Sequence, residues 1–531
     1  FVIMDHVDSG GYSLMMVNEI HWTVQSAYPI LSTLQLIPVM AVVLMVLLRD
    51  QKILYPLAVL MAMIELFVAV DLYRHFDVAQ TALQMSEHGD LFSFWPYHVA
   101  ADGLTVLFML LTSLITLMIV LYASVRRVAF MGKFLAVVFA VQMTLQGQFA
   151  TQDLLWFVLF SIAEILLIAY LLHNWANAPQ EDLAMQRYMQ FMGAGLVLMV
   201  IGVAMLGWNY ADMHQGQWSF DLQSLKGTPI PLAIQSVIFF LLFYGLAIRI
   251  PLFPLHGWLP LIAEHGTVAV VGVFLLGLKT GVYGLLRFVF PLVPDAVLQW
   301  HQYIVAFAVV GIFYSALLAL MQENLRRLLA FAVVSHTSVL VIGLFSLSHV
   351  AFQGSAVLSV NFGLATSGLL FMSGFVFRRT RTLRLSRLGG LFDHIPMVGA
   401  GFLIAGLSII GMPGTPGFDA VHLVMEAAIE RFGALVTIAA ALGNVAAAGF
   451  LLWAFQRAFL NPVGEGIVQK EIAPITSMER VLIVLIIVTL LGSGFFSEPW
   501  FELVEGSFVN MEAYYEHPLA IEHLNSPLKS E

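Results

Sequence analysis

An apolar run that ends in a cluster of prolines reads Ser236-Val-Ile-Phe-Phe-Leu-Leu-Phe-Tyr-Gly-Leu-Ala-Ile-Arg249-Ile-Pro251-Leu-Phe-Pro254-Leu-His256-Gly-Trp-Leu-Pro260. The part before Arg249 is apolar enough for a membrane helix, whereas each proline removes a helix hydrogen bond. A broken helix at bilayer depth is tolerated only where it is buried in protein or lines a wet cavity. The stretch therefore predicts a discontinuous membrane helix and marks a candidate functional region.

The composition extends this interpretation to the whole chain. Hydrophobic residues make up 60% of the 531 residues and charged residues 11%, against roughly 25% charged in a soluble domain. The sequence contains no cysteine, which excludes thiolate-held iron–sulfur clusters, disulfides and Cys-type zinc sites. The methionines are better suited to packing helices than to binding metal. We expect an all-α polytopic membrane protein with no cofactor or metal in this chain and no nucleic-acid partner.

Apolar runs long enough to cross a bilayer predict about fourteen membrane helices. They lie near residues 29–49, 53–72, 101–124, 130–149, 153–173, 187–209, 231–250, 267–290, 302–321, 326–347, 355–377, 397–430, 432–458 and 478–496. We expect residues 1–28 to form an extracytoplasmic segment, without the basic region of a cleavable signal peptide, and residues 497–531 to form an acidic extracytoplasmic tail.

The basic residues give the orientation, because cytoplasmic loops carry an excess of Lys and Arg. One set of loops holds Arg49, Lys52, Arg126, Arg127, Lys133, Arg187, Arg326, Arg327, Arg378, Arg379, Arg381, Arg384, Arg387, Arg457, Lys470 and Arg480. The opposite set, with both termini, holds only Arg74, Lys226, Arg287, Arg431 and Lys529. We therefore predict a multi-pass protein of the bacterial cytoplasmic (inner) membrane with both termini extracytoplasmic.

A second break supports an internal repeat. The twelfth span contains Gly411-Met-Pro413-Gly414-Thr-Pro416-Gly417, which interrupts a helix as strongly as the prolines of the seventh span do. The glycines around Lys279 in the eighth span are a weaker signal. Two broken helices five spans apart are typical of inverted repeats. We expect helices 1–3 at 29–124, a first five-helix repeat at 130–290, a second at 302–458, and helix 14 at 478–496.

Few ionisable residues lie within the predicted spans, and each is a functional candidate because an intramembrane charge costs at least about 2.5 kcal/mol. Glu164 and Lys279 both lie in the middle of apolar helices. Burial disfavours the charged form of a lysine, as a proton relay requires. Arg249 can pair with Glu164, or its side chain can extend to the membrane interface. Each of these residues could instead serve structure alone.

Further candidates lie near the breaks. His336 is in the tenth span, and His256 lies between the prolines of the seventh; histidine exchanges protons near neutral pH, although each could be a structural donor. Asp419, His422 and Glu426 follow the second break on one helix face, where they form either a proton path or a solvated helix end. Water between these groups could be held by hydroxyl-bearing side chains, namely Tyr283, Ser335, Ser338 and Thr280.

These residues resemble one family, the antiporter-like subunits of respiratory complex I (the M-type chain especially), of membrane-bound hydrogenases and of Mrp cation/proton antiporters. Asp102-Gly103 and four longer stretches carry the resemblance, over roughly residues 100 to 460. The stretches are Pro251-Leu-Phe-Pro254-Leu-His256-Gly-Trp258-Leu-Pro260, Leu278-Lys279-Thr-Gly281-Val-Tyr283-Gly284-Leu-Leu-Arg287-Phe, Ala319-Leu-Met-Gln322-Glu323-Asn-Leu-Arg326-Arg327-Leu-Leu-Ala-Phe-Ala-Val-Val-Ser335-His336 and Gly411-Met-Pro413-Gly414-Thr-Pro416-Gly417-Phe418.

The resemblance implies fourteen helices in inverted five-helix repeats, with broken helices 7 and 12. It also implies a glutamate–lysine pair on helices 5 and 7, a relay lysine on helix 8 and a charge on helix 12. Those roles fall here on Glu164, Arg249, Lys279 and the region of Asp419 and His422. The chain departs from the family at Arg249, which replaces a lysine, and after the second break, where Val421 replaces a glutamate.

The leading hypothesis is a proton-translocating subunit of a complex I-type assembly (NADH:quinone oxidoreductase-like), without redox chemistry of its own. It would work with other membrane subunits, lipids and a soluble redox or zinc-bearing partner. Protons would pass along Glu164, Lys279, His336 and the acids of helix 12. Three alternatives remain open: a proton-conducting subunit that energises an inorganic-carbon (CO2/bicarbonate) uptake complex, a stand-alone cation/proton antiporter, and a scaffold that has lost conduction.

Overall fold

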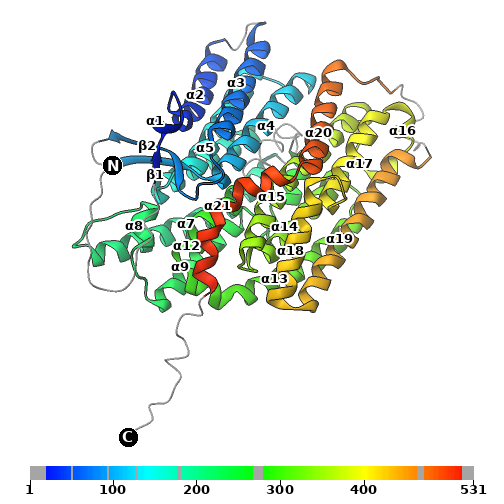
Figure 1. Ribbon diagram of the computed structural model, residues 1–531. Coiled ribbons are helices and arrows are strands. Elements are labelled where there is room, and N and C mark those ends of the chain that lie inside the picture. The colour runs from blue at the N-terminus through cyan, green and yellow to red at the C-terminus, as the bar shows by residue number, and fades with distance from the viewer. Residues whose placement is uncertain are drawn as a thin grey trace.

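The structure is a computed structural model that describes residues 19–48, 52–92, 95–126, 128–175, 181–266, 279–462 and 472–516. Within these residues it is a helical bundle, shown in Figure 1. Ten of the described helices are long and apolar enough to cross a membrane. The fourteen spans and their inverted repeats stay predictions, because residues 267–278 of the eighth span lie outside the described ranges.

The first half of the bundle contains α2 (Ile30–Leu47), α3 (Leu54–His75), α4 (Gly103–Arg126), α5 (Met131–Ala150), α6 (Leu154–Trp175), α7 (Glu181–Met213), α9 (Leu232–Ala247) and α10 (Leu259–His265). The second half contains α13 (Pro294–Leu320), α14 (Leu325–Leu344), α15 (His349–Thr380), α17 (Pro396–Ile410), α18 (Pro416–Phe432), α19 (Ala434–Phe455) and α20 (Ser477–Phe495). Between the halves, residues 279–284 are helical and continue into the π-helical segment η1 (Leu285–Val289) and the short α12 (Phe290–Leu292).

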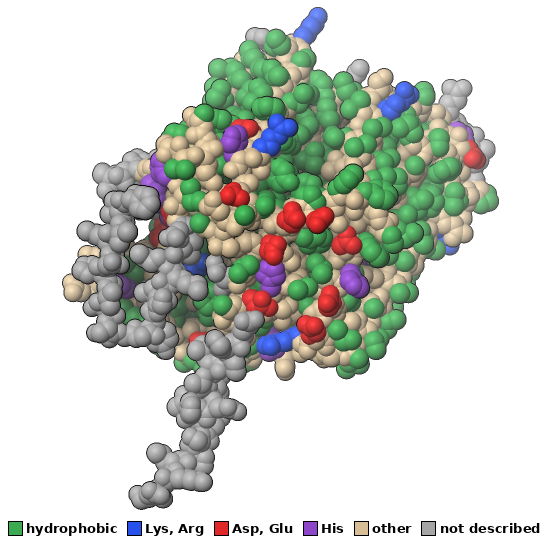
Figure 2. All heavy atoms as spheres, viewed as in Figure 1, with side chains coloured by type: hydrophobic (Ala, Val, Ile, Leu, Met, Phe, Trp, Pro, Cys, Tyr) green, Lys and Arg blue, Asp and Glu red, His purple; other side chains and the backbone are tan. Residues whose placement is uncertain are grey.

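Burial separates central from peripheral helices. The membrane-length windows of α4 and α14 are 89% buried and that of α15 is 83% buried, whereas those of α19 and α20 are 28% buried. Figure 2 shows apolar side chains over most of one face of the molecule. Because lipid is the solvent for such a face, α19 and α20 can contact lipid or neighbouring subunits, and the polar groups of the central helices are shielded from both.

Both predicted helix breaks are present. Helix α9 ends at Ala247, an irregular segment follows, and α10 begins at Leu259. Helix α17 ends before Gly411, which has φ +77°, and Gly414 has φ +85°; α18 begins at Pro416. Positive φ favours glycine because it has no Cβ, so these two glycines allow the sharp turn between the two half-helices.

Two features were not predicted from the sequence. A three-stranded sheet contains β1 (Glu19–His21), parallel to β2 (Leu83–Phe92), which is antiparallel to β3 (Trp95–Ala101). The expected acidic tail begins with another helix, α21 (Glu498–Glu516), which contacts α4 and α15 and crosses the bundle in red in Figure 1. The contact is close: a Cβ on Gly103 would lie 1.6 Å from the backbone oxygen of Leu503. A glycine at the start of α4 is therefore needed for α21 to pack there.

Candidate functional site

A buried ion pair joins α6 to the first broken helix. Nη1 of Arg249 lies 2.8 Å from Oε2 of Glu164, and the two side chains are 5% and 4% exposed. The same Arg249 nitrogen donates to the hydroxyl of Thr280 at 2.9 Å, and Gln148 donates to Glu164 at 2.9 Å. A buried pair is tolerated when further hydrogen bonds satisfy its charges. Arg249 therefore pairs with Glu164, and its side chain does not extend to the interface.

A small cavity lies beside this pair and contains the buried lysine. The cavity offers about 30 Å³ to the centre of a water molecule, enough for one or two waters. Its polar walls are Lys279, His336, Thr337, Ser359 and Thr366, and its apolar walls are Ile250, Pro251, Val282, Val333, Leu340, Phe362 and Ile409. The lysine and the histidine that were predicted as relay groups thus line the same small cavity.

The local sequence explains why Lys279 fits there. A Cβ on Gly363 of α15 would lie 2.9 Å from Cε of Lys279 and 3.6 Å from Nζ. A larger residue at position 363 would displace the lysine side chain, because packed interiors leave little room for an added methyl group. The glycine therefore creates the space that the lysine side chain occupies between the central helices.

Two polar atoms at the cavity have no hydrogen-bond partner among the described residues. They are Nε2 of His336 and Oγ of Ser359. Buried polar atoms are nearly always satisfied by protein or ordered water, and a water needs two to four polar partners. The cavity therefore has the polar groups that a water between Lys279 and His336 requires.

The cavity and the ion pair are neighbours along the chain as well as in space. Ile250 and Pro251, which follow Arg249, line the cavity, and Thr280, which follows Lys279, bonds Arg249. On the other side, Ile409 lines the cavity next to Ser408, whose hydroxyl donates to Asn361 at 2.6 Å just before the second break. Polar groups thus extend from Glu164 through the cavity toward the Gly411 turn.

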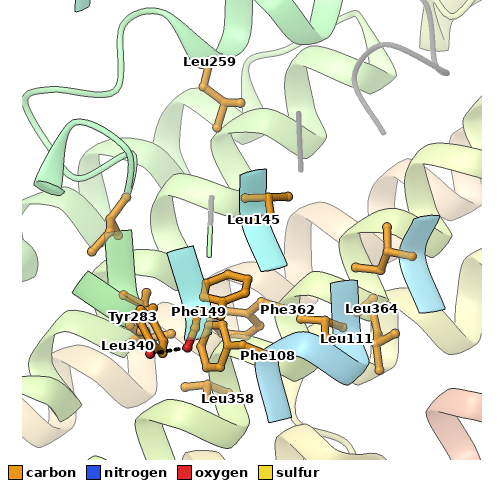
Figure 3. Close-up of a cluster of buried hydrophobic side chains, with 14 of the residues drawn as sticks. Phe108, Leu111, Leu145, Phe149, Leu259, Tyr283, Leu340, Leu358, Phe362 and Leu364 are labelled. Carbon is orange, nitrogen blue, oxygen red and sulfur yellow. Dashed lines mark hydrogen bonds between the residues drawn. The ribbon is translucent and has the colours of Figure 1, made fainter. Parts of the chain in front are cut away.

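Three of the predicted supporting residues lie outside this line. Tyr283 donates to the backbone oxygen of Phe149 at 2.6 Å, as Figure 3 shows within an apolar cluster. Ser335 bonds the backbone of Ile312 at 3.3 Å. The ring of His256 is buried and lies 5.4 Å from that of Tyr314. None of the three lines the cavity around Lys279.

Of the three candidate residues on α18, one is partly buried and two are exposed. Asp419 is partly buried and accepts a hydrogen bond from Ser497, whereas His422 and Glu426 are exposed. Among the described residues, these three side chains form no hydrogen bond or ion pair with Lys279 or His336 and do not line their cavity. Asp419, His422 and Glu426 therefore lie at or near the protein surface, beyond the second helix break.

The buried charged groups that sequence reasoning missed include Arg287 and Glu65. Arg287, which had been counted as a loop residue, pairs with Asp102 and donates to Tyr283 at 3.0 Å. Glu65 of α3 is fully buried, and Gln146 donates to it at 3.1 Å. Glu65 could have been found by the criterion that identified Glu164, a lone carboxyl group in an apolar span.

Comparison with known proteins identifies the chain's relatives. The family described as "NADH:quinone oxidoreductase/Mrp antiporter, TM" matches residues 151–447. The NADH-quinone oxidoreductase subunit M of Escherichia coli (strain K12) is 26% identical over 427 residues, which cover 79% of this chain and 83% of that protein. The NAD(P)H-quinone oxidoreductase chain 4 of Acaryochloris marina is 29% identical over 508 residues, covering 92% and 93%.

Solved structures share the fold. A chain of respiratory complex I from Thermus thermophilus with bound NADH superposes with a TM-score of 0.80 at 26% identity, covering 91% of this chain and 100% of that one. A chain of the Mrp complex from Dietzia sp. superposes with a TM-score of 0.81 at 18% identity, covering 93% and 99%. The family match spans more than half of the sequence, and the fold agrees with it. The chain belongs to the NADH:quinone oxidoreductase/Mrp antiporter family of membrane proteins.

Proposed function

We propose that this chain moves protons across the membrane as an antiporter-like subunit of a complex I-type assembly. The observation that carries the proposal is the cavity shared by the buried side chains of Lys279 and His336, next to the Glu164–Arg249 pair. A path for protons needs titratable groups at bilayer depth, separated by distances that one or two waters can bridge. Lys279 accepts and releases the proton, His336 and water pass it on, and Glu164 with Arg249 sets the local charge.

The energy comes from partners. The sequence has no cysteine to hold an iron–sulfur cluster, and two of its relatives are named as subunits of NADH- and NAD(P)H-quinone oxidoreductases. Neighbouring membrane subunits contact the sparsely buried helices such as α19 and α20, lipids cover what remains, and a soluble redox subunit supplies the driving force. In this proposal the soluble partner carries redox centres, whereas the inorganic-carbon alternative requires a zinc-bearing one.

The test is proton uptake by proteoliposomes that contain the purified assembly. Addition of NADH with a quinone acceptor should acidify the lumen in a medium without Na⁺, and a protonophore should abolish the pH change. Uptake that appears only when Na⁺ is present would contradict the proposal and indicate cation/proton exchange. Uptake driven by an imposed Na⁺ gradient in the isolated chain would contradict it in the same way.

We also propose that both termini lie outside the cytoplasm in a bacterial inner membrane. The absence of cysteine makes this testable, because one introduced thiol is the only labelling site. Gln217 and Ser386 are both exposed and belong to loops that the charge asymmetry assigns to opposite sides. An impermeant maleimide should label Gln217→Cys in intact spheroplasts and Ser386→Cys only after lysis. The reverse pattern would invert the predicted topology.

A further inference from the structure

A cluster of metal-binding side chains lies in the small sheet, away from the proposed proton path. It contains Glu19, His88 and His98, whose ligand atoms all lie within 4.8 Å of one another. The sheet register creates it: His88 of β2 is the direct cross-strand partner of His98 of β3, and β1 places Glu19 beside them. The two imidazole rings stack with centroids 4.3 Å apart.

The separation of each histidine nitrogen from the carboxylate suits a zinc site. Nε2 of His88 and Nε2 of His98 each lie 3.2 Å from Oε2 of Glu19. In a tetrahedral zinc site with bonds near 2.0–2.1 Å, ligand atoms are about 3.3 Å apart. Two imidazole nitrogens and a carboxylate oxygen form a ligand set that zinc uses when one position is left for water. We propose that Glu19, His88 and His98 bind a divalent transition-metal ion, with Zn²⁺ the expected one.

A fourth residue supports this assignment. Nδ1 of His98 lies 2.8 Å from Oδ1 of Asp221. Metal-binding histidines almost always bond a carboxylate or carbonyl through their second nitrogen, which fixes the tautomer and the ring orientation. Asp221 also caps α8 (Leu222–Lys226), because its side chain accepts from the backbone nitrogens of Gln223 and Ser224. The residue that orients His98 is therefore itself held in place.

The exposed fractions of the three side chains suit a site that is held in place by packing and is still open to solvent. The side chains of His98 and Glu19 are 12% and 20% exposed, whereas that of His88 is 56% exposed. Two ligands are thus fixed by packing, and the third opens the site to solvent for entry of the ion. A bound ion would connect β1, the β2–β3 hairpin and, through Asp221, the start of α8, on the side assigned to the cell exterior.

Without a metal, the cluster is held together by hydrogen bonds between the histidines and the carboxylates. Burial lowers the pKa of His98, but hydrogen bonds to Asp221 and Glu19 outweigh it and raise the pKa to about 9. Burial raises the pKa of Glu19, but the hydrogen bond and charge of His98 lower it to about 2. A metal ion would have to displace the proton held in these hydrogen bonds, so direct measurement of metal binding is the necessary test.

The experiment uses the full chain, purified in detergent without a histidine tag and stripped with EDTA. Titration with Zn²⁺ against a chromophoric chelator should give one tight site per chain. His98→Ala should weaken that site at least 100-fold, and Asp221→Asn by roughly 10- to 100-fold, the usual effect of losing an orienting partner. Asparagine caps helices as well as aspartate, so this second variant keeps the fold of α8.

The control is His214→Ala, because His214 is exposed, follows α7 and lies outside the cluster. It should leave the Zn²⁺ affinity unchanged. Zn²⁺ should also raise the melting temperature of the wild type but not that of His98→Ala. If the latter does not fold, His88→Ala replaces it, since His88 is the most exposed ligand. Equal Zn²⁺ affinity in wild type and the ligand variants, or no binding by the wild type, would overturn the proposal.

Discussion

Replacing Lys279 with alanine should reduce NADH-driven proton uptake by the assembly roughly 100-fold, the typical contribution of a positioned proton-transfer group. Lys279 lines the buried cavity, as do His336 and Ser359, each of which has a polar atom with no hydrogen-bond partner among the described residues. The alanine variant removes the titratable group but also enlarges the cavity, so extra water could carry part of the flux. Lys279→Met avoids this because it keeps most of the side-chain volume, and it should lose at least as much uptake.

The effect should be specific to transport. Among the described residues Lys279 has no ion-pair partner, and burying an unpaired ammonium group costs stability, so Lys279→Met should not lower the melting temperature or the yield of assembled complex. Lys133→Ala is the matched control, since Lys133 is an exposed lysine at the start of α5. Gly363→Ala should reduce uptake in part, because its added methyl group would meet Cε of Lys279 at 2.9 Å. Full uptake in Lys279→Met would show that the path bypasses this residue and would favour the scaffold hypothesis.

The helices and their breaks were predictable because they depend on local properties of the sequence. A bilayer requires about 20 apolar residues for each crossing, and prolines such as Pro251 and Pro254 remove hydrogen bonds wherever they occur. The break around Gly411 follows from the same reasoning. The presence of Lys279 and His336 in spans was equally visible. Their position in one cavity depends on how α14 and α15 pack against the eighth span, which no local pattern specifies.

The parts that could not be predicted depend on contacts between distant segments. The sheet pairs residues near 19, 83 and 98, and its strands are not markedly apolar. Helix α21 depends on Gly103, nearly 400 residues earlier in the chain, which admits the backbone of Leu503. Tyr283 lies one helical turn from Lys279, but its hydroxyl reaches α5 and Arg287 and not the cavity. The spacing of Lys279 and Tyr283 places them on one face of the helix, but it does not show which segments pack against each side chain.

The absence of cysteine was one reason to predict a chain without a metal site. It excludes thiolate ligands, but histidine and carboxylate ligands remain, and Glu19, His88 and His98 come from three separate strands. Zinc sites are recognised in sequences by short spacings between ligands, and these three residues show none. The expectation of a chain without metal rested on cysteine and methionine, whereas the proposed site uses histidine and carboxylate ligands, which the cross-strand pairing of His88 with His98 helps bring together.

The ion pair allows stability to be separated from conduction. Arg249→Met should destabilise the protein by about 3–5 kcal/mol, because it leaves a buried carboxylate without its charge partner. The hydrogen bond from Gln148 to Glu164 would remain, and Thr280 would lose the bond from Arg249. The double variant Glu164→Gln/Arg249→Met should recover most of that loss, since replacing both members of a buried pair by neutral residues is often neutral. Thermal unfolding in detergent measures both effects.

Proton uptake should respond differently from stability in these variants. Proton uptake by the double variant should stay well below that of the wild type even though the variant is stable. The variant lacks the charges of Glu164 and Arg249, which in the proposal set the local charge around Lys279. Arg249→Lys should keep the pair with Glu164 and support uptake, since lysine is the residue that the family resemblance places there and it can also release a proton. If the double variant pumped at the wild-type rate, the Glu164–Arg249 pair would serve folding alone, and the path would begin at Lys279.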